Sequence, residues 1–257
     1  MIQNAPHELL VDNEQAAVRI CNPSGRSPFL LIGDHAGNLV PRSLSELGLD
    51  TTILAQHVGW DIGVAELGRT LSVALDAIFI SQSYSRLVID CNRDPASSEA
   101  VPTISDGRAV PGNLGVTPSE RDARFSDLFA PYQAAIADEI DRRVMEGQSP
   151  ILVSLHSFTP KLQEVERPWQ IGVLHDGHND GFARRLLAAL QRRTDFVVGD
   201  NEPYRMDSTD FTIPYHAFSR GLGYVELEVR QDLLADRAGI EFWAGLLAEL
   251  MEQERIG

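Results

Sequence analysis

The sequence predicts a three-layer αβα fold around a mixed, mostly parallel sheet. Short apolar runs, typical of strands buried on both faces, alternate with amphipathic helical stretches from one end of the chain to the other. The chain has 257 residues and is 43% hydrophobic, which is enough for a sizeable core. No repeat or linker divides it, so residues 1–257 are expected to form a single domain.

The first strand is predicted at residues 29–32, where the run FLLI lies between Pro28 and Gly33. Similar apolar runs predict about six more strands. They are expected at residues 77–80, 86–90, 151–155, 170–174, 196–198 and 224–229.

Helices are predicted between these strands. Residues 61–74 have apolar side chains at helical spacing, with Asp61 placed to cap the first turn. The longest helix begins at Thr117, which is followed by a proline and then a glutamate, and it ends before Gly147; Pro131 is expected to kink or split it. Two further amphipathic helices are expected at residues 179–193 and 239–253, and residues 93–117 are expected to form a long loop that is either functional or mobile.

Composition excludes several classes of function. Lys and Arg number 22 against 37 Asp and Glu, and the net charge of −15 disfavours nucleic acid and anionic membrane surfaces as partners. The two cysteines suit a reducing compartment. The sequence shows neither an apolar run of membrane length nor a signal-peptide pattern, so a cytoplasmic location is expected, with the oligomeric state left open.

Polar residues follow several predicted strands, and this clustering is the main sign of a functional site. Asp34 and His35 follow the first strand, Asp90, Asn92 and Arg93 follow another, and His156 ends a fourth. Strand ends of this kind meet at one rim of an α/β sheet, where ligands and metals bind.

Two histidines and one carboxylate can hold a catalytic divalent metal such as zinc with a position left open for water. His35 and His156 are the predicted ligands, although hydrogen bonds from strand-end histidines to the backbone are an equally open interpretation. Asn38 has the spacing of a third ligand, but an amide binds zinc poorly, so Asp61 is the preferred carboxylate.

Two other groups are suited to acid–base work and anion binding. Glu226 and Glu228 alternate in a predicted strand and point to the same face, which suggests a general base; a solvent-facing strand paired with Arg230 is the alternative. Arg86 flanks the Asp90 segment and is suited to gripping a carboxylate or an oxyanion, unless it only forms an ion pair with Asp90.

The sequence shows no pattern for a second metal site, a nucleotide-binding loop or a serine or cysteine nucleophile. The segment 175–180, HDGHND, has the composition of a metal cluster, but its Gly and Asn indicate a turn between a strand and a helix. No dinucleotide or P-loop glycine pattern follows a predicted strand, and Gly-x-Ser-x-Gly is absent. Cys91 has no adjacent base and is expected in the core.

Taken together and in order, these pieces resemble the N-formylglutamate amidohydrolase family. The matching segments are HAG at 35–37, Asp61, SRLVIDCNR at 85–93, LHS at 155–157, NEPY at 201–204 and ELEVRQDL at 226–233. That family is related in architecture to zinc carboxypeptidases and aspartoacylase, so the resemblance implies a phosphorylase/hydrolase-like α/β fold. In those relatives a His-x-x-Glu pair and a distant histidine bind zinc, whereas here Asn38 occupies the glutamate position.

The resemblance implies roles for individual residues. His35, His156 and Asp61 would bind Zn²⁺ or another divalent metal, and Glu228 would act as general base with Glu226 as the reserve. Arg86 would stabilise the oxyanion. The substrate carboxylate would be held by Arg93 with Asn92, and Tyr204 and His216 would line the pocket.

The implied reaction is hydrolysis of N-formyl-L-glutamate to formate and glutamate, at the end of a histidine degradation route. The substrate would be a small molecule, and another N-acyl amino acid or a peptide end is the alternative within the same class. A carboxylate-binding protein without catalysis is the alternative that Asn38 favours. The metal hypothesis requires His35 and His156 to converge beside Arg86.

Overall fold

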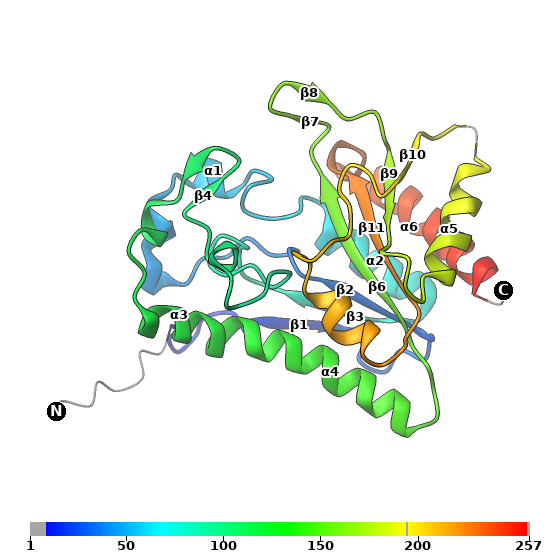
Figure 1. Ribbon diagram of the computed structural model, residues 1–257, viewed down its shortest axis with the longest axis horizontal. Helices are drawn as coiled ribbons and strands as arrows, with labels where there is room; N and C mark the ends of the chain where they lie inside the picture. Colours follow the sequence, from blue (N-terminus) through cyan, green and yellow to red (C-terminus); the bar gives the residue numbers. More distant parts are fainter. Residues whose placement is uncertain (1–8, 194, 256–257) are drawn as a thin grey trace.

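The computed structural model describes residues 9–193 and 195–255. These residues form a seven-stranded sheet in the order β1-β3-β2-β6-β11-β9-β10 (Figure 1). Neighbouring strands are parallel except in the pairs β1–β3 and β11–β9, so the predicted mixed, mostly parallel sheet is confirmed. The strands are β1 (Val18–Cys21), β2 (Phe29–Gly33), β3 (Ile78–Gln82), β6 (Ile151–Phe158), β9 (Ile171–Leu174), β10 (Val198–Asp200) and β11 (Tyr224–Arg230).

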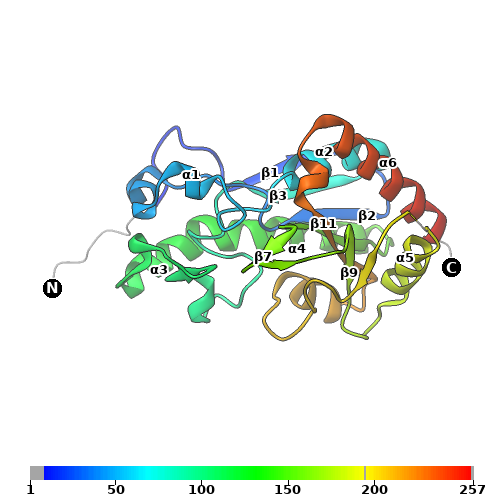
Figure 2. The same cartoon turned by 90° about the horizontal axis from the view of Figure 1, so that it is seen from above.

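Helices cover both faces of the sheet (Figures 1 and 2). On one face lie α2 (Val64–Leu75), α5 (Gly181–Gln191) and α6 (Arg237–Glu254), and on the other lies α4 (Ala130–Met145). Strand β2 shows why both faces must be covered, because its apolar side chains point alternately to one face and the other. Phe29 and Leu31 pack in the first core, whereas Leu30 and Ile32 pack with Tyr132 of α4 in the second. The α/β layers expected from the sequence are confirmed.

Shorter elements lie in the connections. They are α1 (Thr51–Leu54), α3 (Pro118–Arg124) and the two hairpins β4 (Ile104–Ser105) with β5 (Arg108–Ala109) and β7 (Lys161–Leu162) with β8 (Val165–Glu166). Thr117 and Glu120 form the expected capping box of α3. A π-helical segment, Phe125–Phe129, joins α3 to α4 directly before Pro131, whose nitrogen cannot donate to the helix, so the expected interruption takes this form.

Two local predictions are wrong, and one strand was not predicted. Residues 86–90 are a turn segment and not a strand, because Ser85 Oγ accepts from the Leu87 amide (3.1 Å) and Asp90 Oδ1 accepts from the Asn92 amide (2.9 Å). The edge strand β1 has mixed exposure and no continuous apolar run, so no local pattern predicted it. The N-cap of α2 is Gly63, and the Asp61 side chain bonds elsewhere.

Two glycines in helices give a matched prediction about stability. Gly68 of α2 faces the ring of Phe79, and an added methyl would overlap that ring, whereas Gly245 of α6 has open space at the same position. Gly68→Ala should lower the free energy of unfolding by about 1–3 kcal/mol. Gly245→Ala should raise it by up to about 1 kcal/mol through helix propensity. Denaturant titration checks both, and equal effects would contradict this packing of α2 on β3.

Among the described residues, no helix combines the length and the hydropathy that a membrane span requires.

Candidate metal centre and active site

Three distant segments bring two histidines and an aspartate together. His35 follows β2, His156 lies in the neighbouring strand β6, and Asp61 precedes α2. The Asp61 amide donates to the His35 carbonyl (2.9 Å), which fixes these two segments side by side. The two imidazole ring centroids are 5.0 Å apart, and all three side chains are buried. The expected convergence of the histidines is therefore present in the structure.

The donor atoms of this cluster have the spacing of metal ligands. One atom from each of His35, Asp61 and His156 lies within 4.8 Å of the others. Asp61 Oδ2 is 2.9 Å from His156 Nδ1 and 3.6 Å from His35 Nδ1. Ligands about 2.0–2.1 Å from a tetrahedral ion stand roughly 3.3 Å apart. His35 Nδ1 is buried with no hydrogen-bond partner in the described chain, so the residues fit a divalent metal.

The outer nitrogen of each imidazole is held by a second polar group. His35 Nε2 lies 2.7 Å from Asp90 Oδ1. His156 Nε2 lies 3.0 Å from Ser154 Oγ and 3.5 Å from Asp34 Oδ2. Partners of this kind fix the orientation of metal-binding histidines. They leave both Nδ1 atoms directed toward the Asp61 carboxylate.

The charge of the cluster also favours a cation. Burial alone would raise the pKa of Asp34, Asp61 and Asp90, but the neighbouring basic groups hold all three pKa values below the usual range. Burial likewise opposes protonation of His35 and His156, yet the carboxylates around them raise the pKa of both rings. Carboxylates thus surround both imidazoles, and a bound divalent cation would supply the positive charge that they favour.

Glu226 and Glu228 lie beside the cluster on β11. The strand register pairs Glu228 with His156 and Glu226 with Ser154. Burial raises the pKa of each carboxyl to about 8, and the Oε2 atom of each has no hydrogen-bond partner among the described residues. Both glutamates are buried in the middle of the sheet, so the alternative of a solvent-facing strand is wrong.

Arg86 connects the cluster to the cavity. Its Nη2 and Nε donate to Asp90 Oδ2 at 2.8 and 3.2 Å, and its Nη1 lies 3.7 Å from Asp61 Oδ1. The ion pair with Asp90 therefore exists, and the guanidinium also lines the cavity next to the metal ligands.

Arg93 and Asn92 differ in the hydrogen bonds that their side chains form within the protein. Arg93 Nη1 donates to the Asn92 carbonyl (2.9 Å) and lies 3.4 Å from Asp210 Oδ1, and the guanidinium lines the cavity. Asn92 Oδ1 accepts from the Phe211 and Thr212 amides, and its Nδ2 donates to Asp210. Asn92 and Arg93 both line the cavity, and the Asn92 side chain also holds the 210–212 loop in place.

Tyr204 lines the cavity, but His216 does not. The Tyr204 hydroxyl accepts from Arg167 Nη1 (3.0 Å), and the Arg167 guanidinium lies 4.8 Å from the Tyr204 ring centroid. His216 is fully buried and bonds Gln133 Oε1 through Nε2 (2.7 Å), and burial lowers its pKa to about 4. The prediction that His216 lines the pocket is wrong, because its short helical segment packs into the core beneath the site.

Asn38 also lies away from the cluster. It lines a separate cavity of about 250 Å³ with Ala36, Gly37 and Trp60. Asp61 supplies the carboxylate beside His35, as the sequence favoured, and the position three residues after His35 is not used. The argument from Asn38 for a metal-free binding protein therefore loses its structural basis.

These side chains surround a cavity of about 300 Å³, at the lower end of the range for small-ligand pockets. Its wall includes the metal-type cluster, both glutamates and several further polar groups. Members of the wall are His35, Asp61, Arg86, Arg93, His156, Tyr204, Arg205, Asp210, Glu226 and Glu228. The arrangement can place an anionic ligand between a divalent ion, a buried carboxyl group and two arginines.

Sequence reasoning did not assign roles to Asp34, Asp90 or Arg167. Asp34 and Asp90 stand at predicted strand ends beside assigned residues, and that position was a usable signal for groups that orient the histidines. Arg167 follows the β7–β8 hairpin and carries no such signal, because only the fold brings it to Tyr204.

The chain is similar to known proteins over most of its length. The family model described as N-formylglutamate amidohydrolase matches residues 27–235, a segment that contains the whole cluster. The solved structure of gene product Atu2144 from Agrobacterium tumefaciens is 34% identical with a TM-score of 0.92, and the match covers 96% of this chain and 98% of that chain.

A second solved structure, N-formylglutamate amidohydrolase from Ralstonia eutropha JMP134, is 17% identical with a TM-score of 0.66, covering 93% of this chain and 99% of that chain. This likeness concerns the fold. No curated protein matches the chain.

Proposed function

The chain belongs to the N-formylglutamate amidohydrolase family, and from this premise we propose that it hydrolyses N-formyl-L-glutamate to formate and glutamate with a divalent metal, Zn²⁺. One observation carries the proposal. His35, Asp61 and His156 converge in a buried cluster, and a carboxyl group and an arginine stand beside it in the same cavity.

The proposed metal ligands are His35 Nδ1, His156 Nδ1 and the Asp61 carboxylate. Imidazole and carboxylate donors suit zinc, and three protein ligands leave a position for water or substrate. A bound divalent ion supplies Lewis acidity toward the acyl oxygen and lowers the pKa of water to near 7.

Glu228 is the proposed general base. The strand register places Glu228 opposite the proposed ligand His156, and Asp61 and Arg86 also act on its charge, whereas Glu226 lies opposite Ser154. Its pKa of about 8 lies close to the operating pH that proton transfer favours. Glu228 would take a proton from the attacking water and return it to the amide nitrogen as glutamate leaves.

The two arginines would divide the remaining work. Arg86 lies next to the cluster and would stabilise the oxyanion of the tetrahedral intermediate, a contribution of about 2.7–4 kcal/mol for one well-placed donor. Arg93 would hold a substrate carboxylate, because its planar guanidinium can donate two parallel hydrogen bonds.

Arg93→Lys should raise KM for N-formylglutamate by about 10- to 100-fold with a smaller change in kcat, because a hydrogen bond to a charged group is lost. Steady-state kinetics measures the two constants separately. Arg69→Lys, on an exposed arginine of α2, is the matched control and should leave both unchanged. An unaltered KM in Arg93→Lys would remove Arg93 from the carboxylate site.

A formate assay tests the function itself. Protein purified without chelator and supplied with zinc should release formate and glutamate in equal amounts from N-formyl-L-glutamate. Neutral N-formyl amino acids should be poorer substrates, because they lack the second carboxylate. Hydrolysis of a different N-acyl amino acid alone would reassign the substrate. No turnover of any N-acyl amino acid with zinc or cobalt would contradict the proposal.

A cytoplasmic location, a single domain over residues 1–257 and a place in histidine degradation stay predictions from the sequence.

A further inference from the structure

A second and larger cavity adjoins the proposed active site. Its volume is about 790 Å³, against about 300 Å³ for the cavity at the cluster. The two share His57, Arg86, Arg93 and Tyr204 in their walls, so they lie next to each other. A pocket of about 300 Å³ already suffices for a small ligand. The hydrolysis of a formyl group leaves this additional space unused.

The wall of the larger cavity combines polar side chains with a set of aliphatic ones. The aliphatic side chains come from the 54–59 turn, the 86–90 turn, the β4–β5 and β7–β8 hairpins, and the segments that precede β4 and α3. They are Val58, Leu87, Val101, Ile104, Val116 and Leu162. Surfaces of this kind pack the methylene groups of an extended chain.

The charged groups of the cavity are mostly paired with each other. Asp90 binds Arg86, Glu99 lies 3.6 Å from Arg93, and Asp106 lies 3.2 Å from His57.

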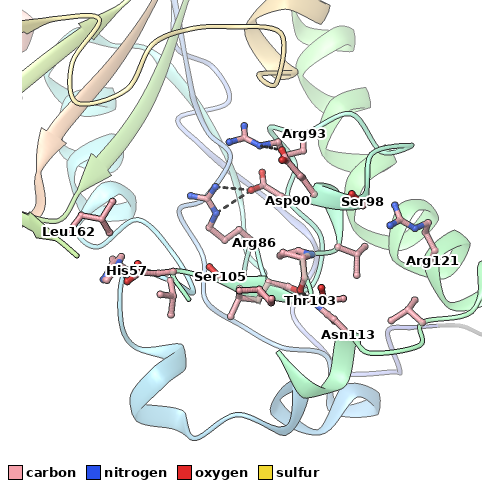
Figure 3. Close-up of a pocket in the computed structure, with 18 of the residues that line it drawn as sticks. His57, Arg86, Asp90, Arg93, Ser98, Thr103, Ser105, Asn113, Arg121 and Leu162 are labelled. Carbon is pink, nitrogen blue, oxygen red and sulfur yellow. Dashed lines mark hydrogen bonds and ion pairs between the residues drawn. The ribbon is translucent and has the colours of Figure 1, made fainter. Parts of the chain in front are cut away.

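Arg121 is held differently. Its Nη1 donates to the carbonyl oxygens of Pro95 and Ser97 at 2.9 and 3.0 Å. These neutral acceptors orient the guanidinium without cancelling its charge. Figure 3 shows Arg86 beside Asp90 and places Arg121 on α3, beyond Ser98.

We infer that this cavity is the acyl-chain part of the substrate site, and that it takes N-acyl amino acids whose acyl chain ends in a carboxylate bound by Arg121. The inference rests on the proposed function. A substituent on the acyl carbon begins next to Arg86, which is the proposed partner of the oxyanion and lines both cavities. It then passes the aliphatic wall and reaches Arg121.

A ladder of substrates tests the inference. Malonyl, succinyl, glutaryl and adipoyl derivatives of glutamate are compared with neutral acyl derivatives of equal length, and released glutamate is measured. At one or more lengths the diacid should have at least a tenfold higher kcat/KM than its neutral partner. In Arg121→Gln that advantage should disappear, while kcat/KM for N-formylglutamate stays unchanged.

A second variant and a binding measurement keep the test decisive if Arg121→Gln does not fold or if the protein does not turn over any substrate. Thr103→Glu places a negative charge in the same wall, and it should lower kcat/KM for the diacids only. Calorimetry with free glutarate and adipate reports the Arg121 site without turnover, and binding should weaken in both variants.

The outcomes separate the two proposals. Turnover of N-formylglutamate with no diacid preference, or with equal losses for all substrates in Arg121→Gln, overturns the acyl-chain assignment and leaves the proposed function. Absence of all hydrolysis overturns the proposed function. In that event, dicarboxylate binding that depends on Arg121 supports the anion site, and its absence overturns it.

Discussion

Glu228→Gln is expected to lower kcat by about 10²- to 10⁴-fold while the zinc content stays at one ion per chain. Glutamine has nearly the same shape but cannot accept a proton from water, and Glu228 is not one of the three proposed ligands. Burial raises the pKa of the Glu228 carboxyl to about 8, and the substitution removes this titrating group. Single-turnover kinetics and metal analysis of the same sample measure the two quantities.

Glu226→Gln is the matched control for this prediction. Glu226 lies two residues earlier on the same strand, is equally buried and has a pKa also raised to about 8 by burial. In the strand register Glu226 lies opposite Ser154, whereas Glu228 lies opposite the proposed ligand His156, so kcat should fall much less. If Glu226→Gln is the inactive variant and Glu228→Gln is active, the base is Glu226 and the assignment made here is wrong.

Asp61→Asn is expected to abolish stoichiometric zinc binding and, with it, hydrolysis. The change removes the carboxylate that lies between the two Nδ1 atoms. Loss of a direct ligand should reduce affinity by more than the roughly 10- to 100-fold that loss of an outer partner costs. Zinc affinity is measured by competition with a chromophoric chelator, and thermal unfolding of the metal-free protein shows whether the variant is folded.

Asp90→Asn separates a ligand from an orienting partner. Asp90 accepts from His35 Nε2 at 2.7 Å and also binds Arg86, but it is not in the three-residue cluster. Zinc affinity should fall within the 10- to 100-fold range. Equal losses in Asp61→Asn and Asp90→Asn would argue that Asp61 does not bind the metal directly.

The central strands could be predicted because their sequences are apolar on both faces. Residues 29–32 and 77–80 are both runs of four apolar side chains, and all of these side chains are buried. His35 and His156 follow or end such strands, and neighbouring parallel strands must bring those ends together. The proximity of His35 and His156 could therefore be predicted from the sequence.

Other features depended on tertiary contacts that no local pattern encodes. Residues 86–90 are apolar enough for a strand, but side-chain hydrogen bonds from Ser85 and Asp90 hold the backbone in a turn. His216 has the residue type of a site group, yet the bond to Gln133, which lies 83 positions away in the sequence, keeps it in the core.

The metal position is the claim on which the account depends. The most direct test is an anomalous difference map from a crystal of the zinc-loaded protein, with data collected on both sides of the zinc absorption edge. One strong peak is expected within bonding distance of His35 Nδ1, His156 Nδ1 and the Asp61 carboxylate. Zinc located at other residues, or a fully zinc-treated crystal with no peak at this cluster, would contradict it.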